Sequence, residues 1–195
     1  MAKKVFFSFH YQDVVEFRAN VVRKHWVLKS DREEAGFFDK SIWEENKKDG
    51  DIALKKMINK ALEYTSNTVV LTGTETFERP WVRYEIMKSF LRGNHLLVVH
   101  INNINGKDGK TKPKGRNPLE YVAACFSVDG KTVTLKEYTD GNWVEYKKID
   151  GKSTHTCSSS MSSGYESKAI KLSSLYLSYD WTLDEGYKNF SSWLK

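Results

Sequence analysis

Cysteine and long hydrophobic runs are both scarce in this 195-residue sequence, and each scarcity excludes a class of protein. Only Cys125 and Cys157 are present, in no metal-ligand spacing, so a disulfide framework is excluded and a reducing cytoplasm is expected. No window approaches the ~18 apolar residues of a membrane span, which excludes an integral membrane protein. The apolar run Val5–Phe9 is too short for a signal peptide and instead predicts a β-strand.

Familiar catalytic motifs are missing as well. The chain has no P-loop, nucleophile elbow, H-E-x-x-H pair, G-x-G-x-x-G turn or paired C-x-x-C. Its five histidines are scattered, so no metal site is predicted. A phosphoaccepting receiver domain needs acidic residues after its first and third strands. This sequence has Ser8-Phe9-His10 and Leu71-Thr72-Gly73 there, which excludes that class.

The net charge of +6 first suggests an anionic partner, but its distribution argues otherwise. The excess is spread evenly over both halves of the chain. The one dense basic cluster lies in a stretch with three glycines and a proline, which predicts a solvated loop. A nucleic-acid partner is therefore not expected, since phosphate contacts need several basic side chains on one ordered face. The cluster consists of Lys107, Lys110, Lys112, Lys114 and Arg116.

Strand-like and helix-like patterns alternate through the first hundred residues, which predicts a doubly wound, flavodoxin-like α/β fold with a parallel sheet. Buried strands are expected at residues 5–9, 68–72 and 95–101, with a weaker candidate at 36–39. Helices are expected at residues 14–28, 51–65 and 80–92, with Asp13 and Asp51 as caps of the first two. Ligands of such folds bind outside the carboxyl ends of the strands.

The pattern changes after about residue 102. Two Asp-Gly pairs, at 129–130 and 140–141, separate three strand-like runs and predict an antiparallel β-meander. A Ser- and Gly-rich loop is expected at 152–168, followed by a last strand within 170–181 and a helix at 183–194. The chain is thus interpreted as one domain, 1–195, in which residues 102–168 form an insertion.

One pair of residues offers chemistry. Trp81 and Glu85 are four residues apart at a helix start, beside the core stripe of Val82, Ile86 and Phe90. An aromatic ring can stack on a flat heterocycle, and a nearby carboxylate can hold ribose hydroxyls and stabilise an oxocarbenium-like transition state as nicotinamide leaves. Taken alone, the spacing is more typical of a Trp packed at a helix start and a Glu favoured by the helix dipole.

Several segments together resemble TIR domains. Residues 5–13 look like the first strand and loop of that family, and residues 52–58 and 66–72 resemble the helix and strand before its catalytic region. Trp81 to Glu85 matches the W-x-x-x-E box. Over nearly its whole length, the chain is similar to the TIR-like proteins of Thoeris anti-phage defence systems.

The resemblance implies an enzyme that responds to a phage-derived trigger. It would cleave NAD at the nicotinamide–ribose bond and cyclise ADP-ribose into a signal for the effector ThsA, with NAD as substrate and no cofactor. Glu85 would be the catalytic carboxylate. The substrate-binding positions that the resemblance implies are Trp81, Phe6, Ser8, His10 and Asp39.

Two alternatives stay open at this point. The first is a TIR-like interaction module without catalysis, since many TIR domains act by associating with one another, and self-association is expected on that account. The second is a basic nucleic-acid-binding protein or nuclease, which the absence of a metal-binding carboxylate cluster disfavours. Single residues have alternatives too: Phe6 is more typical of a core residue, and Asp39 also fits a solvent-exposed loop.

Overall fold

A parallel five-stranded sheet organises the protein, for which a computed structural model describes residues 3–28, 32–35 and 48–194. Its order, β2-β1-β3-β4-β10, is the flavodoxin-like order, and each neighbouring pair is parallel. The strands are β1 (Lys3–Phe9), β2 (Arg32–Ala35), β3 (Asn67–Thr72), β4 (His95–His100) and β10 (Ser178–Asp180). The predicted doubly wound α/β fold is confirmed.

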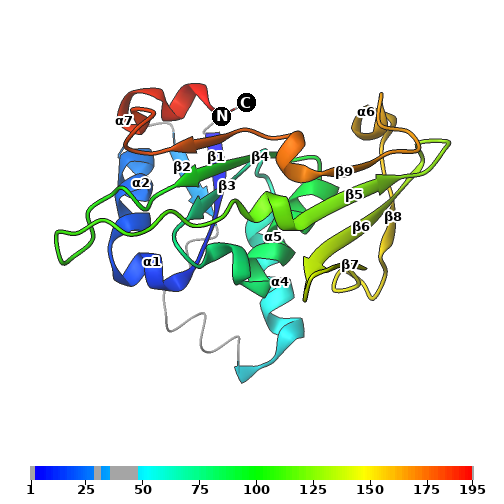
Figure 1. Cartoon of the computed structure of the whole chain (residues 1–195), viewed down its shortest axis with the longest axis horizontal. Helices are drawn as coiled ribbons and strands as arrows, with labels where there is room; N and C mark the ends of the chain where they lie inside the picture. Colours follow the sequence, from blue (N-terminus) through cyan, green and yellow to red (C-terminus); the bar gives the residue numbers. More distant parts are fainter. Residues whose placement is uncertain (1–2, 29–31, 36–47, 195) are drawn as a thin grey trace.

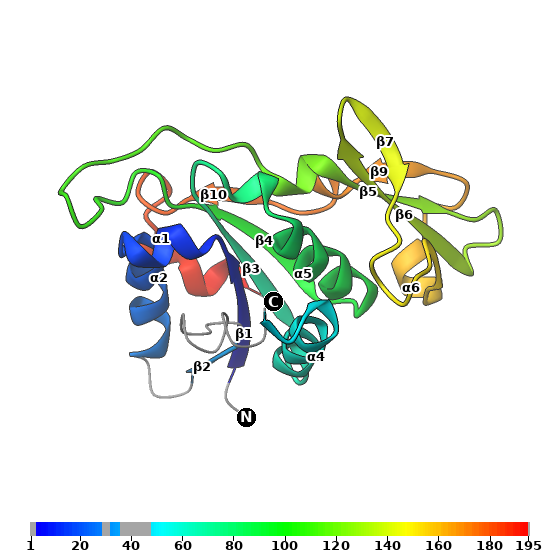
Figure 2. The same ribbon diagram turned by 90° about the horizontal axis from the view of Figure 1, so that it is seen from below.

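Helices cover both faces of this sheet (Figures 1 and 2). One face carries α1 (Tyr11–Val15), α2 (Arg18–Val27) and α7 (Gly186–Asn189), followed by the short 3₁₀ helix η4 (Phe190–Ser192). The other carries α4 (Asp51–Leu62) and α5 (Pro80–Leu91), with η1 (Thr76–Glu78) leading into α5. Alternate side chains of β1 serve the two cores, because Val5 and Phe7 pack toward α2 while Phe6 packs toward α5.

A second, antiparallel sheet lies beyond α5, so that this helix is held between two sheets (Figure 2). Its order is β7-β6-β5-β9, and β8 also pairs with β6. An ion pair of 3.0 Å between Arg83 on α5 and Glu137 on β6 ties the two layers. The strands of the antiparallel sheet are β5 (Val122–Phe126), β6 (Thr132–Thr139), β7 (Asn142–Glu145), β8 (Thr154–Thr156) and β9 (Ala169–Lys171). The short helices η2 (Pro118–Tyr121), α6 (Ser159–Ser162) and η3 (Leu172–Ser174) lie in the same part of the chain.

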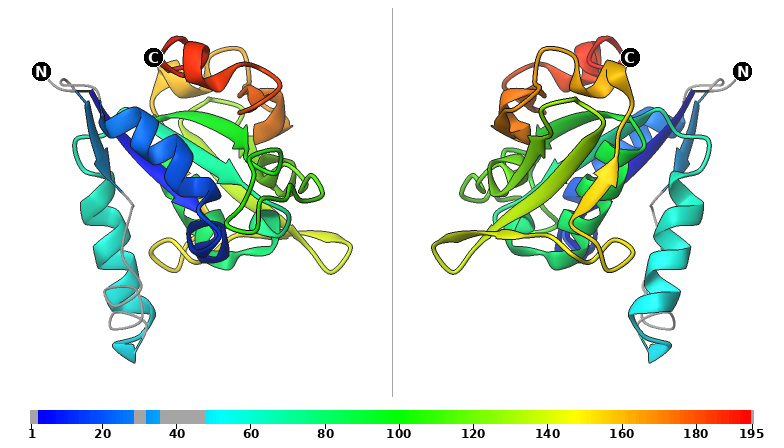
Figure 3. Two further views of the ribbon diagram at one scale, coloured as in Figure 1. Left: turned by 90° about the vertical axis from the view of Figure 1, so that its left-hand side faces the viewer. Right: turned by 90° about the vertical axis from the view of Figure 1, so that its right-hand side faces the viewer.

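The predicted meander is confirmed, and its turn chemistry explains one hairpin. Asp140 and Gly141 join β6 to β7 with φ values of 49° and 80°, the positive pair that a type I′ turn requires. The tip of this hairpin projects from the body of the protein (Figure 3). The domain boundaries stay a prediction, although the antiparallel sheet also takes in β9, just beyond residue 168.

The helix predicted after Asp13 is two helices. Phe17, with φ 66°, separates α1 from α2. Asp13 is not a cap, because it lies inside α1 as a buried carboxylate that accepts a hydrogen bond of 3.3 Å from Thr76. Asp51 is likewise the first residue of α4, and Gly50 is the cap. In both cases an Asp near a helix start indicates the helix but not its exact boundary.

Three predictions in the C-terminal half are wrong in detail. The expected loop at 152–168 contains β8 and α6. The expected strand within 170–181 is divided, because β9 pairs with β5 in one sheet while β10 pairs with β4 in the other. The helix expected at 183–194 is only α7 and η4. The strand candidate at 36–39 lies outside the described residues.

The basic loop is anchored across the carboxyl ends of the parallel strands. The buried Arg18 guanidinium donates to the carbonyls of Ile104 at 3.0 Å and Lys110 at 2.7 Å. Thr74 donates to the Pro113 carbonyl at 2.8 Å, and Lys112 pairs with Glu16. The predicted solvated loop is confirmed, since most of residues 107–116 are exposed, and a buried arginine elsewhere in the sequence satisfies part of its backbone.

Gly115 in this loop allows the close approach. A Cβ atom at this position would lie 1.9 Å from the Gly73 carbonyl oxygen at the end of β3. Gly115→Ala should therefore lower the free energy of unfolding by about 2 kcal/mol or more, measured by chemical denaturation. The neighbouring Lys114 is exposed, so Lys114→Ala should change it by less than about 0.5 kcal/mol. Equal stabilities for the two variants would refute the tight packing of the loop.

Candidate active site

A buried serine–carboxylate pair lies between the parallel sheet and α5. Ser8, near the end of β1, donates a hydrogen bond of 2.5 Å to Oε2 of Glu85 on the second turn of α5. Ser8 is 1% exposed and Glu85 is 5% exposed. The alternation that turns Phe6 toward α5 also turns Ser8 toward it, so the strand register positions the hydroxyl.

Glu85 is more deeply placed than its sequence position suggests. It was expected beside the stripe of Val82, Ile86 and Phe90, yet it is buried like these residues. The hydrogen bond from Ser8 explains the difference, because it shows that the Glu85 side chain points toward β1 of the parallel sheet. The carboxylate therefore lies in a site from which bulk water is largely excluded, where electrostatic interactions are strong.

Burial controls the protonation of this site. It raises the pKa of Glu85 to about 8, and the hydrogen bond from Ser8 acts in the opposite direction. Near neutral pH the protonated acid is therefore favoured in the protein alone. A cationic group brought beside Glu85 would favour the carboxylate, so the arrangement suits a reaction in which positive charge develops.

Ser8→Ala tests that coupling. The substitution removes the interaction that favours the charged form, so the pKa of Glu85 should rise above its value in the parent protein. Carboxyl-carbon NMR titration of the two proteins measures this directly. An unchanged or lower pKa in the variant would show that the hydroxyl does not stabilise the carboxylate.

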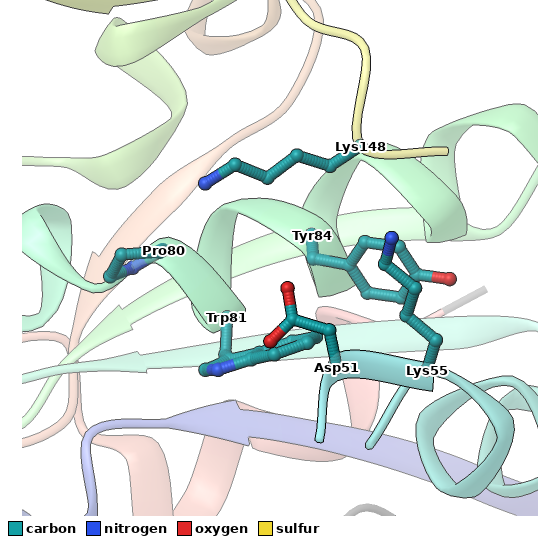
Figure 4. A pocket seen from close by; sticks show the side chains of 6 residues that line it. All are labelled: Asp51, Lys55, Pro80, Trp81, Tyr84 and Lys148. Carbon is teal, nitrogen blue, oxygen red and sulfur yellow. The ribbon is translucent and has the colours of Figure 1, made fainter. Parts of the chain in front are cut away.

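Trp81 lies one turn before Glu85 and lines a pocket of about 130 Å³ (Figure 4). The edge of its ring meets Tyr84, with centroids 5.7 Å apart, and the Tyr84 hydroxyl donates to Asn59 at 3.1 Å. The indole is therefore held in place as an aromatic wall, on which a heterocycle can stack. The pocket is lined by Asp51, Lys55, Pro80, Trp81, Tyr84 and Lys148.

His10 lines a different pocket, of about 250 Å³, at the carboxyl ends of β1 and β3. This is where the strand order reverses, the usual ligand position in doubly wound folds. Burial and the nearby Arg79 lower the pKa of His10. Burial raises the pKa of Asp13, in the same pocket, to about 6. The structure thus joins Ser8 to Glu85 but places His10 and Trp81 in separate pockets.

The structure gives no support for two of the predicted substrate-binding positions. Phe6 is fully buried in the core cluster that includes Ile58 and Val82, so its role in substrate binding stays a prediction. Asp39 lies outside the described residues. The roles of Trp81, Ser8, His10 and Glu85 also stay predictions, because the structure brings together only Ser8 and Glu85 among them.

Sequence reasoning missed two residues from the insertion. Lys148 lines the pocket of Trp81. Tyr146 is fully buried, and within the described part of the chain its hydroxyl has no hydrogen-bond partner. Burial raises the pKa of Tyr146, and nearby Glu137 and Glu85 add to the effect. No local signal identifies either residue, because both depend on the packing of the second sheet against α5.

Neither a metal centre nor a membrane-spanning helix is found among the described residues. In residues 3–28, 32–35 and 48–194, no group of three or more His, Cys, Asp or Glu side chains is placed to hold a metal ion. Over the same ranges, no helix has the length and apolar character needed to cross a membrane.

Comparison with known proteins gives two matches. A family model described as "Thoeris protein ThsB, TIR-like domain" matches residues 6–105, which include Ser8, Trp81 and Glu85. A protein of Bacillus cereus (strain MSX-D12) named "Putative cyclic ADP-D-ribose synthase ThsB1" is 50% identical over 194 residues, which cover 100% of both chains. The antiparallel sheet lies beyond the family model but within the alignment to this relative.

Proposed function

This chain belongs to the Thoeris ThsB family of TIR-like proteins, and we propose from this premise that it cleaves NAD and cyclises the ADP-ribose part. The observation that carries the proposal is the buried Glu85 carboxyl group, held by Ser8 one turn from an aromatic pocket. A buried carboxyl group beside an aromatic pocket suits a reaction with a cationic transition state, because the carboxylate can stabilise the positive charge.

The first step breaks the bond between ribose C1′ and the nicotinamide nitrogen. The bonding electrons leave with the ring, which becomes neutral nicotinamide, and the ribose becomes oxocarbenium-like. The positively charged pyridinium ring of NAD favours the ionised form of Glu85 when substrate binds. The carboxylate then stabilises the charge that develops on the ribose, while Ser8 fixes its orientation.

The second step closes the ring. A hydroxyl or adenine nitrogen of the same ADP-ribose attacks C1′, and the product is cyclic ADP-ribose, nicotinamide and one proton. A group with a pKa near neutrality, such as Glu85, is suited to accept that proton. Burial of the site disfavours capture by water, which would give linear ADP-ribose instead.

The proposed biological setting follows from the same family. A phage-derived trigger starts the reaction in the cytoplasm, NAD is consumed as a substrate, no separate cofactor takes part, and the cyclic product activates the effector ThsA. Membership of a Thoeris family supports this setting.

The test is release of nicotinamide by the purified full-length protein, with lysate from phage-infected cells supplied as the source of the trigger. Nicotinamide and a cyclic product should form together in the supplemented reaction. Absence of NAD consumption with active lysate would contradict the proposal and would favour a TIR-like interaction module without catalysis.

A further inference from the structure

We propose that the antiparallel-sheet insertion completes the substrate site, with Lys148 and Lys55 binding the diphosphate of NAD above the ring of Trp81. The inference rests on the proposed function and specifies where on the protein the dinucleotide lies. It assigns a binding role to a part of the chain that the family model does not cover.

The backbone on both sides of Lys148 is firmly anchored. Tyr146 is 0% exposed and Ile149 is 1% exposed, and both belong to the core cluster that includes Ile86 of α5. The Tyr146 amide donates to the Leu135 carbonyl at 2.9 Å, which fixes the segment to β6. Lys148 itself is exposed, and its side chain reaches over the pocket while Asp51 and Lys55 approach from α4 (Figure 4).

Both lysines are available for an anionic ligand. Within the described ranges, neither Lys148 nor Lys55 has an ion pair or hydrogen bond, and the Lys55 ammonium lies 5.9 Å from the centroid of the Tyr84 ring. Lys147, the neighbour of Lys148, is by contrast paired with Glu145 at 3.4 Å. Unpaired ammonium groups that share a pocket favour a ligand with two adjacent negative charges.

The two pockets differ in the net charge of the residues that line them. The pocket of Trp81 holds two lysines against the single carboxylate of Asp51, which leaves one positive charge in excess. Among the described residues that line the pocket of His10, Lys112 is paired with Glu16 and Glu75 is paired with Arg79, which leaves the carboxyl group of Asp13 without an ion pair. Electrostatics therefore favours the diphosphate in the pocket of Trp81.

Size and position agree with a diphosphate subsite. A pocket of about 130 Å³ is smaller than the roughly 300–1,000 Å³ that encloses a whole drug-sized ligand, so it takes one part of NAD. Trp81 precedes Glu85 by one helical turn, a rise of about 5.4 Å. Glu85 itself does not line this pocket, so the inference requires the attached ribose to extend from Trp81 along α5 to the carboxylate.

Calorimetric binding of ADP-ribose and of adenosine to the full chain tests the inference without turnover. Lys148→Ala should weaken the binding of ADP-ribose by about tenfold or more and leave adenosine binding unchanged, because only ADP-ribose carries the diphosphate. Lys55→Ala should have the same selective effect. Lys148→Arg should restore most of the affinity, since it restores the charge. Lys147→Ala is the matched control and should bind both ligands like the parent.

Kinetics gives a second readout. Lys148→Ala should raise the KM for NAD by about tenfold, with kcat little changed, because the lysine binds substrate and transition state alike. Parent-like affinity for ADP-ribose in both lysine variants would overturn the inference while leaving the proposed function intact, provided that the parent still cleaves NAD. Equal losses for ADP-ribose and adenosine would also overturn it, since they would indicate a structural defect. A parent protein that neither binds ADP-ribose nor consumes NAD would overturn both.

Discussion

Glu85→Gln should lower kcat for nicotinamide release by about a thousandfold or more. The substitution keeps the shape of the side chain and its contact with Ser8 but removes the negative charge that stabilises the oxocarbenium-like transition state. Because Glu85 is buried, solvent does not replace the lost charge. The measurement is the initial rate of nicotinamide release at saturating NAD, with the phage-derived trigger supplied.

Two controls make this result specific. Glu78→Gln removes an exposed carboxylate just before α5 and should leave kcat within about twofold of the parent. The Glu85→Gln protein should also bind ADP-ribose and show the circular dichroism spectrum of the parent, which excludes misfolding. Turnover within tenfold of the parent would remove Glu85 from the mechanism.

Stability should fall as the pH rises from 6 to 8, and Glu85 should account for the fall. In the folded protein its pKa is raised to about 8, against an ordinary value of 4.5, so the folded state holds a proton that the unfolded state has released. The contribution is therefore complete below about pH 4.5, declines by at most about 1.4 kcal/mol per pH unit, and is lost above about pH 8. The total change is a few kcal/mol.

Urea denaturation at pH 6, 7 and 8 measures this dependence. The parent should lose stability over the interval, whereas Glu85→Gln should lose much less, since an amide does not titrate. The interval from pH 6 to 8 is used because Asp13 also causes a loss of stability as the pH rises. Its pKa is raised to about 6, so most of that loss occurs at lower pH and is the same in parent and variant. Parallel stability profiles for parent and variant between pH 6 and 8 would contradict the raised pKa.

Local sequence signals were sufficient for β1, β3 and β4 of the parallel sheet, for α5 and for the centre of the site. The β-branched run at residues 68–72 and the Pro80 and Gly93 boundaries predict β3 and α5 almost as the structure has them. The spacing of Trp81 and Glu85, together with the resemblance of β1 to TIR domains, identified the residues that the structure places near one another. These features depend on short stretches of chain.

The features that sequence reasoning missed depend on contacts between distant segments. Glu85 is buried against Ser8 of β1, which lies 77 residues away in the sequence, and no pattern in the helix itself predicts this contact. Lys148 lies in the pocket of Trp81 because the insertion packs against α5. The basic loop is ordered by Arg18, which lies 86 residues away from its partner Ile104. Periodicity and turn signals describe single elements, whereas these outcomes depend on how the elements pack.

Glu85 and the residues around it are proposed to convert NAD into a cyclic product. The decisive measurement is mass spectrometry of the products formed from isotopically labelled NAD, with the phage-derived trigger present. Free nicotinamide and a labelled nucleotide one water lighter than ADP-ribose should form, and both should be lost in Glu85→Gln. Labelled NAD that stays intact, or that yields only linear ADP-ribose, would contradict it.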